Sequence, residues 1–311
     1  MRGVHGRRAA AAALALAAGC AGAPARPVTS AGAAATRGTD PDAREWVQLF
    51  NGRDLDGWDV KFKGHDLGVN YNSTFRVDSG MLKVRYDQWT AFKGEFGHLF
   101  YRRPYSHYIV AVEYRFVGEQ VAGAGPGNAW AIRNNGIMAA AQSAASMGRD
   151  QDFPISLEVQ LLGGLDNGRP RTTGNLCTPG THVVLNGTLH TPHCTNSTSR
   201  TYAGDQWVRV EAVVLGDSII KHIVNGDTVL TYSKPVMGGG SADGTRPGVL
   251  QEGKPITEGY IALQAETAPI DFRKVELLDL SGCADPTASN YKRYVVKATS
   301  ATCRYATRAR Q

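Results

Sequence analysis

WVRVEAVVLGDSIIKHIVNGDTVLTY, residues 207–232, contains three short apolar runs separated by two turn signals. Every second residue from Val208 to Val214 is apolar, which is the period of a β-strand with one buried face. Gly216-Asp217 ends this run, and Asn225-Gly226, the strongest short hairpin signal, ends the next. The stretch therefore predicts an antiparallel meander of three strands, at 207–214, 218–224 and 228–232.

Similar short runs, bounded by Gly, Asn, Asp and Pro, recur along most of the chain, whereas helical periodicity is scarce. We expect further strands at 74–77, 81–84, 98–101, 108–116, 136–138, 155–161, 259–264 and 270–277. An Ala-rich stretch, 138–147, suits a helical turn or a packed loop, and 163–204 is the longest irregular segment. Many strands without intervening helices predict an all-β chain built as a two-sheet sandwich or jelly roll.

The amino terminus has the features of an export signal. Three arginines precede a short apolar run that ends in Leu16-Ala17-Ala18-Gly19-Cys20, which resembles a lipobox. We expect residues 1–20 to be a lipoprotein signal peptide whose Cys20 carries the lipid, and residues 21–45 to be a flexible spacer. The protein would then be exported and anchored to a membrane, in the periplasm or at the cell surface. The alternative is an ordinary secretory signal with a chance cysteine.

Acylation of Cys20 would leave four of the five cysteines for disulfides. They fall into two local pairs, Cys177 with Cys194 and Cys283 with Cys303, although the sequence alone allows three connectivities. The second pair would bound a small carboxy-terminal appendage, residues 281–311. A calcium role for Asp285 and Asn290 has little support, because two oxygen ligands do not make a site.

The formal net charge of +6 does not indicate a nucleic-acid partner. Much of the excess arginine lies in the signal segment and in the tail from Arg304 to Arg310. No stripe of Lys and Arg interleaved with aromatic residues is present, and an exported protein does not meet nucleic acid. We therefore expect no nucleic-acid partner.

A set of ordered motifs between residues 46 and 280 resembles the 3-keto-disaccharide hydrolase domain family. The motifs include LFNGRDLDGW at 49–58, NNGIM at 134–138, SLEVQLL at 156–162, HIVNG at 222–226 and GYIALQ at 259–264. The resemblance implies a concanavalin A-like jelly-roll sandwich of two antiparallel sheets, and activity on glycosides oxidised to a ketone at C3. Where family members often carry Arg or His, this chain has Ala139-Ala140-Ala141, so part of the polar lining is expected to be missing.

Strand parity selects the candidate site residues, because alternate side chains of a strand share a face. Glu158 and Gln160 share one face of their strand, with Val159 and Leu161 directed to the core. A carboxylate beside an amide suits the hydroxyls of a sugar. By the same rule Gln264 and Glu266 share a face, as do Arg133 and Asn135. If these strands are neighbours, we expect a shared wall of Glu158, Gln160, Gln264, Glu266 and some of Arg133, Asn134 and Asn135.

Cleavage of a 3-keto glycoside requires few catalytic groups, because the C3 ketone makes the hydrogen on C2 acidic. Removal of that proton lets the C1 substituent leave before water adds. We assign Glu158 as the base and His222 as the alternative base or proton donor, with Gln160, Asn134 and Gln264 orienting the sugar. No cofactor is certain, although a divalent cation could hold the developing enolate.

Structural explanations compete with each assignment. Glu158 could pair with Arg209 or Arg273, and His222 could be a hydrogen-bonded histidine at a sheet end. His193 is expected to be an exposed loop residue, and the tryptophans Trp58, Trp89 and Trp130 either stack on sugars or fill the core. The leading function is a hydrolase or lyase of 3-keto glycosides, with a non-catalytic carbohydrate-binding surface lipoprotein as the alternative. A purely structural surface lipoprotein is the third.

Overall fold

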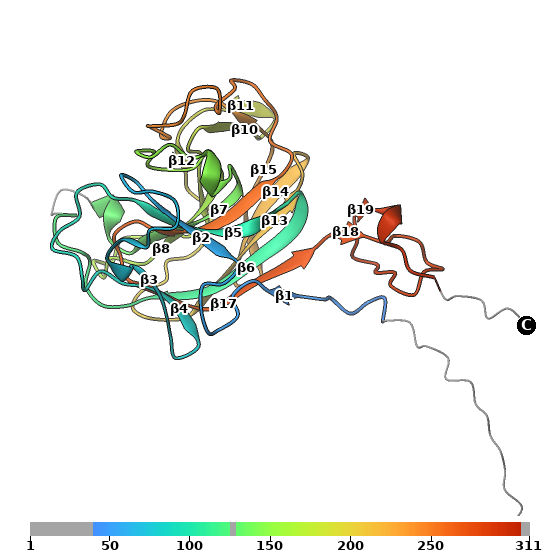
Figure 1. Ribbon diagram of the computed structural model, residues 1–311, viewed down its shortest axis with the longest axis horizontal. Helices are drawn as coiled ribbons and strands as arrows, with labels where there is room; N and C mark the ends of the chain where they lie inside the picture. The colour runs from blue at the N-terminus through green and yellow to red at the C-terminus, as the bar shows by residue number, and fades with distance from the viewer. Residues whose placement is uncertain (1–39, 125–128, 306–311) are drawn as a thin grey trace, which may run out of the picture. The chain divides into compact units, whose positions relative to one another are not determined.

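The structure of this chain, a computed structural model, describes residues 40–124 and 129–305 (Figure 1). Within these ranges the helical elements are single 3₁₀ turns, at η1 (Tyr71–Ser73), η2 (Ala129–Ala131), η3 (Ala144–Ser146) and η4 (Ser300–Thr302). The remaining regular structure there is β-strand, which confirms the predicted all-β class. The proposed signal peptide, Cys20 and most of the proposed spacer lie outside the described residues and stay predictions.

The larger of two antiparallel sheets has ten strands and contains the predicted meander as its neighbours β13, β14 and β15. At the β14–β15 turn, Asn225 and Gly226 both have positive φ, 48° and 95°, as a tight hairpin of this kind requires. In order, its strands are β11 (Thr188–His190), β10 (Thr181–Leu185), β15 (Asp227–Met237), β14 (Ile219–Val224), β13 (Val208–Leu215), β6 (His107–Phe116), β17 (Ile270–Asp279), β4 (Met81–Val84) and β3 (Phe75–Asp78), with β1 (Val47–Gln48) beside β17.

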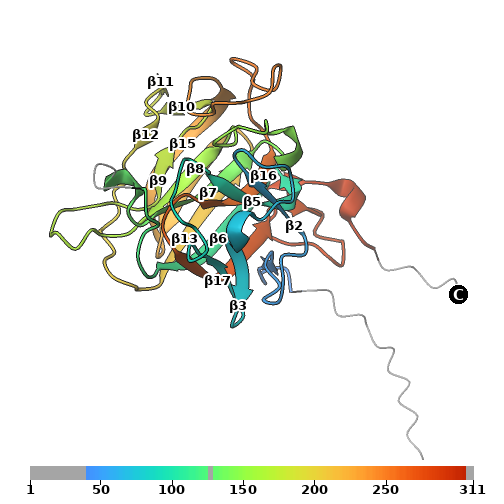
Figure 2. The same cartoon turned by 60° about the vertical axis from the view of Figure 1, so that its left-hand side comes forward.

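The second sheet has seven strands, and Figure 2 shows several of them, β2, β5, β7, β8 and β16, stacked over the first sheet. In order, its strands are β12 (Cys194–Thr195), β9 (Asn175–Cys177), β8 (Leu157–Leu162), β7 (Asn134–Ala141), β16 (Gly259–Ala265), β5 (Gly97–Tyr105) and β2 (Trp58–Phe62). The described part of the chain is therefore the predicted sandwich of two antiparallel sheets.

The core lies between the two sheets and is built by strand alternation. In β13 buried and partly exposed residues alternate over all eight positions, so one face is committed to the interior. Both sheets contribute to one buried cluster, the larger through Val112, Val210 and Val275 and the smaller through Ile137, Val159 and Leu263. Each such aliphatic side chain stabilises the fold by roughly 1.5–3 kcal/mol.

The opposite face of the seven-stranded sheet is partly covered by a second, smaller apolar cluster. Phe100, Met138 and Ala262 on the sheet contact Ala144 and Met147, which belong to the segment after β7. Lys61 ties the end of this segment to strand β2, because its Nζ donates to the carbonyl oxygens of Phe62 (2.6 Å) and Arg149 (2.9 Å). One end of the sheet is thus covered by a loop.

Two local predictions need correction. Residues 138–141 were expected in a helical turn or packed loop but complete strand β7, and only η3 follows as a single turn. All eight residues of β7 are buried, so neither face of this strand is exposed and burial does not alternate along it. Residues 163–204, expected to be irregular, contain the four short strands β9 to β12, which are too short to give a periodic signal.

Both predicted disulfides are present, Cys177 with Cys194 and Cys283 with Cys303, which settles the connectivity. The regular structure of residues 281–305 is the turn η4 and a two-residue parallel pair, β18 (Ser281–Gly282) with β19 (Lys297–Ala298). Asp285 and Asn290 accept hydrogen bonds from neighbouring groups of this segment, so their oxygens already have partners.

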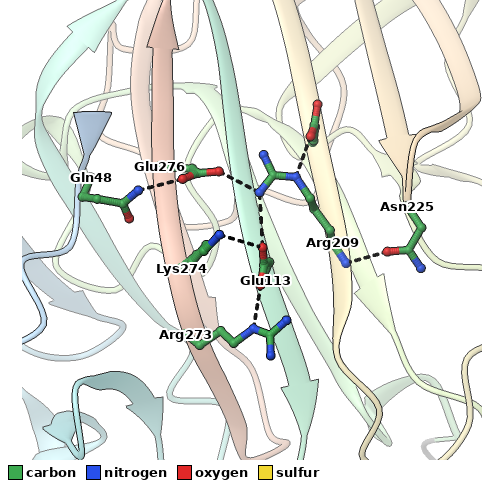
Figure 3. A network of polar contacts seen from close by, with 8 residues as sticks. Gln48, Glu113, Arg209, Asn225, Arg273, Lys274 and Glu276 are labelled. Atoms are coloured by element: carbon green, nitrogen blue, oxygen red, sulfur yellow. Dashed lines mark hydrogen bonds and ion pairs between the residues drawn. The ribbon is translucent and has the colours of Figure 1, made fainter. Parts of the chain in front are cut away.

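The outer face of the ten-stranded sheet carries a polar network centred on Arg209 and Glu113 (Figure 3). Arg209 also pairs with Glu276 at 2.7 Å, and Arg273 pairs with Glu113 at 2.6 Å. Both arginines are thus engaged on the sheet that does not contain Glu158. The alternative in which Glu158 pairs with Arg209 or Arg273 is therefore wrong.

No helix in the described ranges is long and apolar enough to cross a membrane.

Leu263→Ala should lower the free energy of unfolding by about 2–5 kcal/mol, because Leu263 is fully buried between the sheets. Urea unfolding followed by far-UV circular dichroism measures this change. Leu189→Ala makes the same replacement at a residue that is 62% exposed and should change stability by less than about 0.5 kcal/mol. Equal losses in the two variants would contradict the assignment of the core.

Candidate active site

Strand β8 places Glu158 and Gln160 on the outer face of the seven-stranded sheet. Val159 and Leu161 are fully buried in the core between the sheets, as parity predicts. Across β8, Glu158 lies opposite Met138 of β7 and Cys177 of β9. The backbone register therefore fixes where the carboxyl group stands.

Glu158 opens onto a cleft of about 370 Å³ on this outer face. A second carboxyl group, that of Glu266 just after β16, lines the same cleft, together with Asn134 and Gln160. The other lining residues are Phe96, Trp130, Phe153, Cys177, His193 and Cys194. Four of the residues expected to share a wall are thus brought together.

Gly136 makes room for the side chain of Glu158. A Cβ atom at position 136 would lie 2.6 Å from Oε1 and 2.8 Å from Cγ of Glu158, closer than atoms can approach. The φ angle of Gly136 is not positive, so the glycine is required for space rather than for backbone conformation. The Glu158 side chain therefore lies across the backbone of β7.

Several polar atoms at this site are buried without a hydrogen-bond partner in the described structure. They include Oε1 of Glu158, Oε2 of Glu266 and Oδ1 of Asn134. Such atoms are rare in native interiors and call for a ligand, an ion or water. The cleft is therefore prepared for a polar occupant.

Burial sets the protonation of the two carboxyl groups. Burial raises the pKa of Glu158 to about 8. Burial, and then the nearby charge of Glu158, raises the pKa of Glu266 well above its usual value, while Arg171 opposes this rise. Because two neighbouring carboxylates resist ionising together, the pair holds at least one proton near neutral pH.

Gln160 is oriented by a hydrogen bond from the neighbouring strand. Its Oε1 accepts from Nδ2 of Asn175 at 3.2 Å, and Asn175 is itself held by Thr172 and by the backbone of Ser197. Since the oxygen is engaged in this bond, Gln160 can offer its amide nitrogen to the cleft. It can thus act as a hydrogen-bond donor to a ligand.

One wall of the cleft is formed by the Cys177–Cys194 disulfide and by His193. The imidazole lies within 4.8 Å of both sulfur atoms, and the carbonyl oxygen of His193 accepts from the backbone nitrogen of Thr178 at 2.8 Å. His193 is exposed on the loop before β12, as expected, and partial desolvation by its neighbours lowers the pKa of its ring, which favours the neutral form at physiological pH. The disulfide and this backbone bond thus hold His193 at the edge of the cleft.

Aromatic rings border the cleft on other sides. Trp130 is 47% exposed, and Phe96 and Phe153 contact each other with ring centroids 4.6 Å apart. The backbone of Trp130 is held by Arg171, whose Nη2 donates to its carbonyl oxygen at 3.1 Å. Apolar ring faces beside buried polar groups are typical of a small-molecule site.

A sequence model of the family described as "3-keto-alpha-glucoside-1,2-lyase-like domain" matches residues 45–278. The chain belongs to this family. The match covers the whole sandwich, including both carboxyl groups of the cleft, and confirms the resemblance found in the sequence. No curated protein sequence matches the chain significantly.

Three of the solved structures that are similar to this chain are of proteins described as acting on or binding carbohydrates. A "Putative glycosyl hydrolase" from Parabacteroides distasonis ATCC 8503 is 16% identical, with TM-score 0.44, covering 76% of this chain and 99% of its own. Carbohydrate-binding module CBM66 from Bacillus subtilis is 10% identical (TM-score 0.39; 72% and 96%), and the Ca²⁺/Man3GlcNAc-bound VIP36 lumenal domain is 11% identical (0.40; 74% and 87%). At these TM-scores the similarities carry no argument about function.

His222, the alternative base, does not lie in the cleft. It belongs to β14 of the other sheet, on the face that Ile220 and Val224 direct into the interior. Its Nδ1 contacts the carbonyl oxygen of Gly174 and its Nε2 the hydroxyl of Tyr232, both at 2.9 Å. Burial lowers the pKa of His222 to about 4. This placement favours the structural explanation of His222.

Two of the expected substrate-binding residues are also displaced from the cleft lining. Arg133 has a positive φ of 44° and turns its guanidinium to the carbonyl of Gly164 (2.5 Å) and to Asp166 (2.9 Å). Gln264 is fully buried beneath the cleft, opposite His98, and its amide atoms have no partner in the described residues. Gln264 is therefore buried close to the core and does not line the cleft.

Of the three tryptophans weighed as sugar platforms, only Trp130 lines the cleft. Trp58 and Trp89 are buried in the core, where their ring nitrogens donate to Leu49 and Thr74. The alanines at 139–141 are buried in apolar packing away from the cleft lining, so they provide no polar group to it.

The donor set does not complete a metal centre. Glu158, Glu266 and Asn134 offer three oxygens without partners among the described residues, so water would have to supply the remaining ligands of a hard divalent cation. In the described ranges, the one close group of three His, Cys, Asp or Glu ligands is Cys177, His193 and Cys194. Its sulfurs are joined in a disulfide and cannot act as thiolates.

Sequence reasoning missed the roles of His193, Gly136 and the two phenylalanines in forming the cleft. One signal was available: if Cys177 pairs with Cys194 and also neighbours Glu158, then His193 must lie near the carboxyl group. Phe96 and Phe153 stand on connecting segments, where parity gives no direction.

Glu158→Gln should raise the melting temperature, by an amount that grows between about pH 5 and pH 8. A buried carboxyl group with a raised pKa favours the folded state while protonated, and this contribution is lost as the pH rises toward about 8. Glutamine has the same shape and cannot ionise. Differential scanning calorimetry across this range measures the effect, and Glu119→Gln, at an exposed residue, should show none. A pH-independent difference would contradict the raised pKa.

Proposed function

We propose that this protein cleaves glycosides whose sugar carries a ketone at C3, by elimination followed by hydration, in the cleft that contains Glu158. The observation that carries this proposal is the pair of buried carboxyl groups, Glu158 and Glu266, each with an oxygen that lacks a partner in the described structure. Membership of the 3-keto-glucoside lyase-like family supports the choice of substrate.

The first step is removal of the C2 proton by the carboxylate of Glu158. The C3 ketone accepts the electron pair as an enolate, and the amide nitrogen of Gln160 is placed to donate to its oxygen. Burial makes Glu158 a stronger base than an exposed glutamate, because its pKa is about 8. The desolvation that stabilises its protonated form thus also supplies its basicity.

In the second step, the enolate re-forms the ketone and the bond from C1 to the leaving oxygen breaks. The protonated carboxyl group of Glu266 gives its proton to that oxygen, and the sugar is left with a C1–C2 double bond. Water then adds at C1 while C2 regains a proton, so the sum is hydrolysis. A carboxylate and a carboxylic acid are both needed, and a coupled pair with raised pKa values provides them.

We also propose that this chemistry takes place outside the cytoplasm, on a protein attached to the membrane through Cys20. The two disulfides support an oxidising compartment. The lipid anchor remains a prediction from the sequence.

Glu158→Gln should lower kcat on a 3-keto disaccharide by about 10²–10⁴-fold, because it removes the base without changing the shape of the cleft. For the unaltered protein, kcat/KM should rise with pH toward about 8, as Glu158 loses its proton. Released monosaccharide, quantified by chromatography, measures both effects.

The unoxidised disaccharide and the Glu119→Gln variant are the matched controls, and each reaction is run with and without a chelator. Binding of the 3-keto sugar without release would instead support a carbohydrate-binding module. Unchanged turnover in Glu158→Gln would refute the assigned base. Loss of turnover in chelator, restored by a divalent cation, would add a metal ion to the mechanism.

Gly136→Ala should reduce kcat by about 10²-fold, because the new methyl group displaces the carboxyl group of Glu158. Gly240→Ala is the control, since a Cβ there meets no atom within 4 Å. The melting temperature of both variants shows whether the fold persists. Full activity of folded Gly136→Ala would show that the position of Glu158 does not limit the reaction.

A further inference from the structure

We propose that the cleft selects glycosides that carry an ammonium group, and binds them more tightly than neutral glycosides of the same size. This inference rests on the proposed function, because it concerns the substrate of the same cleft. It is carried by the chemistry of the lining: two partnerless carboxyl oxygens, aromatic walls and no lining cation among the described residues.

The floor of the cleft presents acceptors. Oε1 of Glu158, Oε2 of Glu266 and Oδ1 of Asn134 are all buried without partners in the described structure. An ammonium group has three N–H donors and no acceptor, so it can satisfy such oxygens without leaving a donor of the protein unpaired. A sugar hydroxyl satisfies the same oxygens without the charge.

The walls of the cleft suit an organic cation. Trp130, Phe96 and Phe153 border it, with Phe96 in contact with Phe153. The faces of aromatic rings attract ammonium groups, and this attraction grows when water is excluded. A cleft lined by both carboxyl groups and aromatic rings is complementary to a cation attached to a sugar with an apolar face.

The described lining residues include no lysine or arginine that would neutralise the carboxyl groups. The charged and titratable groups around the pair include Arg171, Tyr86, His193 and His98. The ring centroid of His98 lies 6.0 Å from that of Phe153, and burial lowers the pKa of His98 to about 3, so it is neutral. Arg171 acts on Glu266 through its field, but its guanidinium donates to the carbonyls of Trp130, Ile132 and Gly163. Tyr86 is buried and un-ionised near Glu266, and His193 is neutral. The carboxyl pair is therefore undercompensated.

A bare divalent cation is a poorer fit than an ammonium group. The cleft offers three oxygens without partners among the described residues, so water would have to supply half or more of the ligands of a hard cation. No third His, Asp or Glu among the described residues gathers with Glu158 and Glu266 at the spacing of metal ligands. Aromatic walls add nothing to the binding of a small hydrated ion.

Binding of an ammonium group has a signature that neutral ligands lack. Near neutral pH the carboxyl pair retains a proton, because burial raises both pKa values. A cation placed between the two groups favours their ionised forms, so binding expels a proton. An ammonium group would thus also convert Glu158 to the basic form needed for the reaction.

Isothermal titration calorimetry tests the inference with unreactive probes: methyl glucosaminide, methyl N-acetylglucosaminide and methyl glucoside. Titrations of chelator-treated protein at about pH 6.5, where the amine is protonated, are made in two buffers of different ionisation enthalpy. We expect the amine to bind at least ten times more tightly than the two neutral probes and to release a proton. Equal affinities, or binding of the amine without proton release, would overturn the inference.

Variants locate the effect. Glu266→Gln should reduce the preference for the amine several-fold, and Trp130→Leu should weaken binding of the amine more than that of the neutral probes. Glu119→Gln should change neither. An unchanged preference in Glu266→Gln would place the ammonium site elsewhere and overturn the inference. Proton release on adding MgCl₂ or MnCl₂ alone, without any preference for the amine, would also overturn it. Turnover of a neutral 3-keto disaccharide tests the proposed function separately, because it does not require an ammonium group.

Discussion

Strand β8 joins the core of this protein to its cleft, because successive side chains of a strand point to opposite faces. Val159 and Leu161 are fully buried between the two sheets, and this burial determines that Glu158 and Gln160 face outward. A slip of one residue in register would place a carboxyl group in the apolar core. The free energy that holds the sandwich together therefore also holds the candidate base in place, without any direct bond to its carboxyl group.

Burial of polar atoms at this site lowers the stability of the folded state. Polar atoms of Glu158, Glu266 and Asn134 are buried without partners in the part of the chain that the structure describes, although buried polar groups are normally hydrogen-bonded. Gly136 makes the arrangement sterically feasible by leaving space for the carboxyl group. The large apolar cluster between the sheets can offset such local destabilisation. Buried acceptors without partners among the described residues are expected where a ligand supplies those partners. Burial of the carboxyl group is what raises the pKa of the proposed base.

The sequence predicts what depends on alternation and on local pairing. The meander, the sandwich, both disulfides and the facing of Glu158 follow from residues that are periodic or close in sequence. The prediction of a catalytic role for His222 relied on its residue type. The apolar residues Ile220 and Val224, two positions before and after it on the same face of the strand, indicate that this face is interior. Arg133 could not be placed, because its positive φ breaks the parity of the strand it precedes. Trp130, Phe96 and His193 lie in connecting segments, where only tertiary packing sets direction.

The wall that carries His193 depends on a covalent bond. Strand β12 is two residues long, lies at the edge of its sheet and pairs only with β9, so few backbone hydrogen bonds hold it. A disulfide that closes a loop of this size restricts the unfolded chain by roughly 3 kcal/mol, which exceeds what two strand pairs contribute. Because Cys177 also lies opposite Glu158 across β8 and β9, the bond holds the backbone next to His193 close to the strand that carries Glu158. One wall of the cleft thus depends on a disulfide, and disulfides are characteristic of proteins in oxidising compartments.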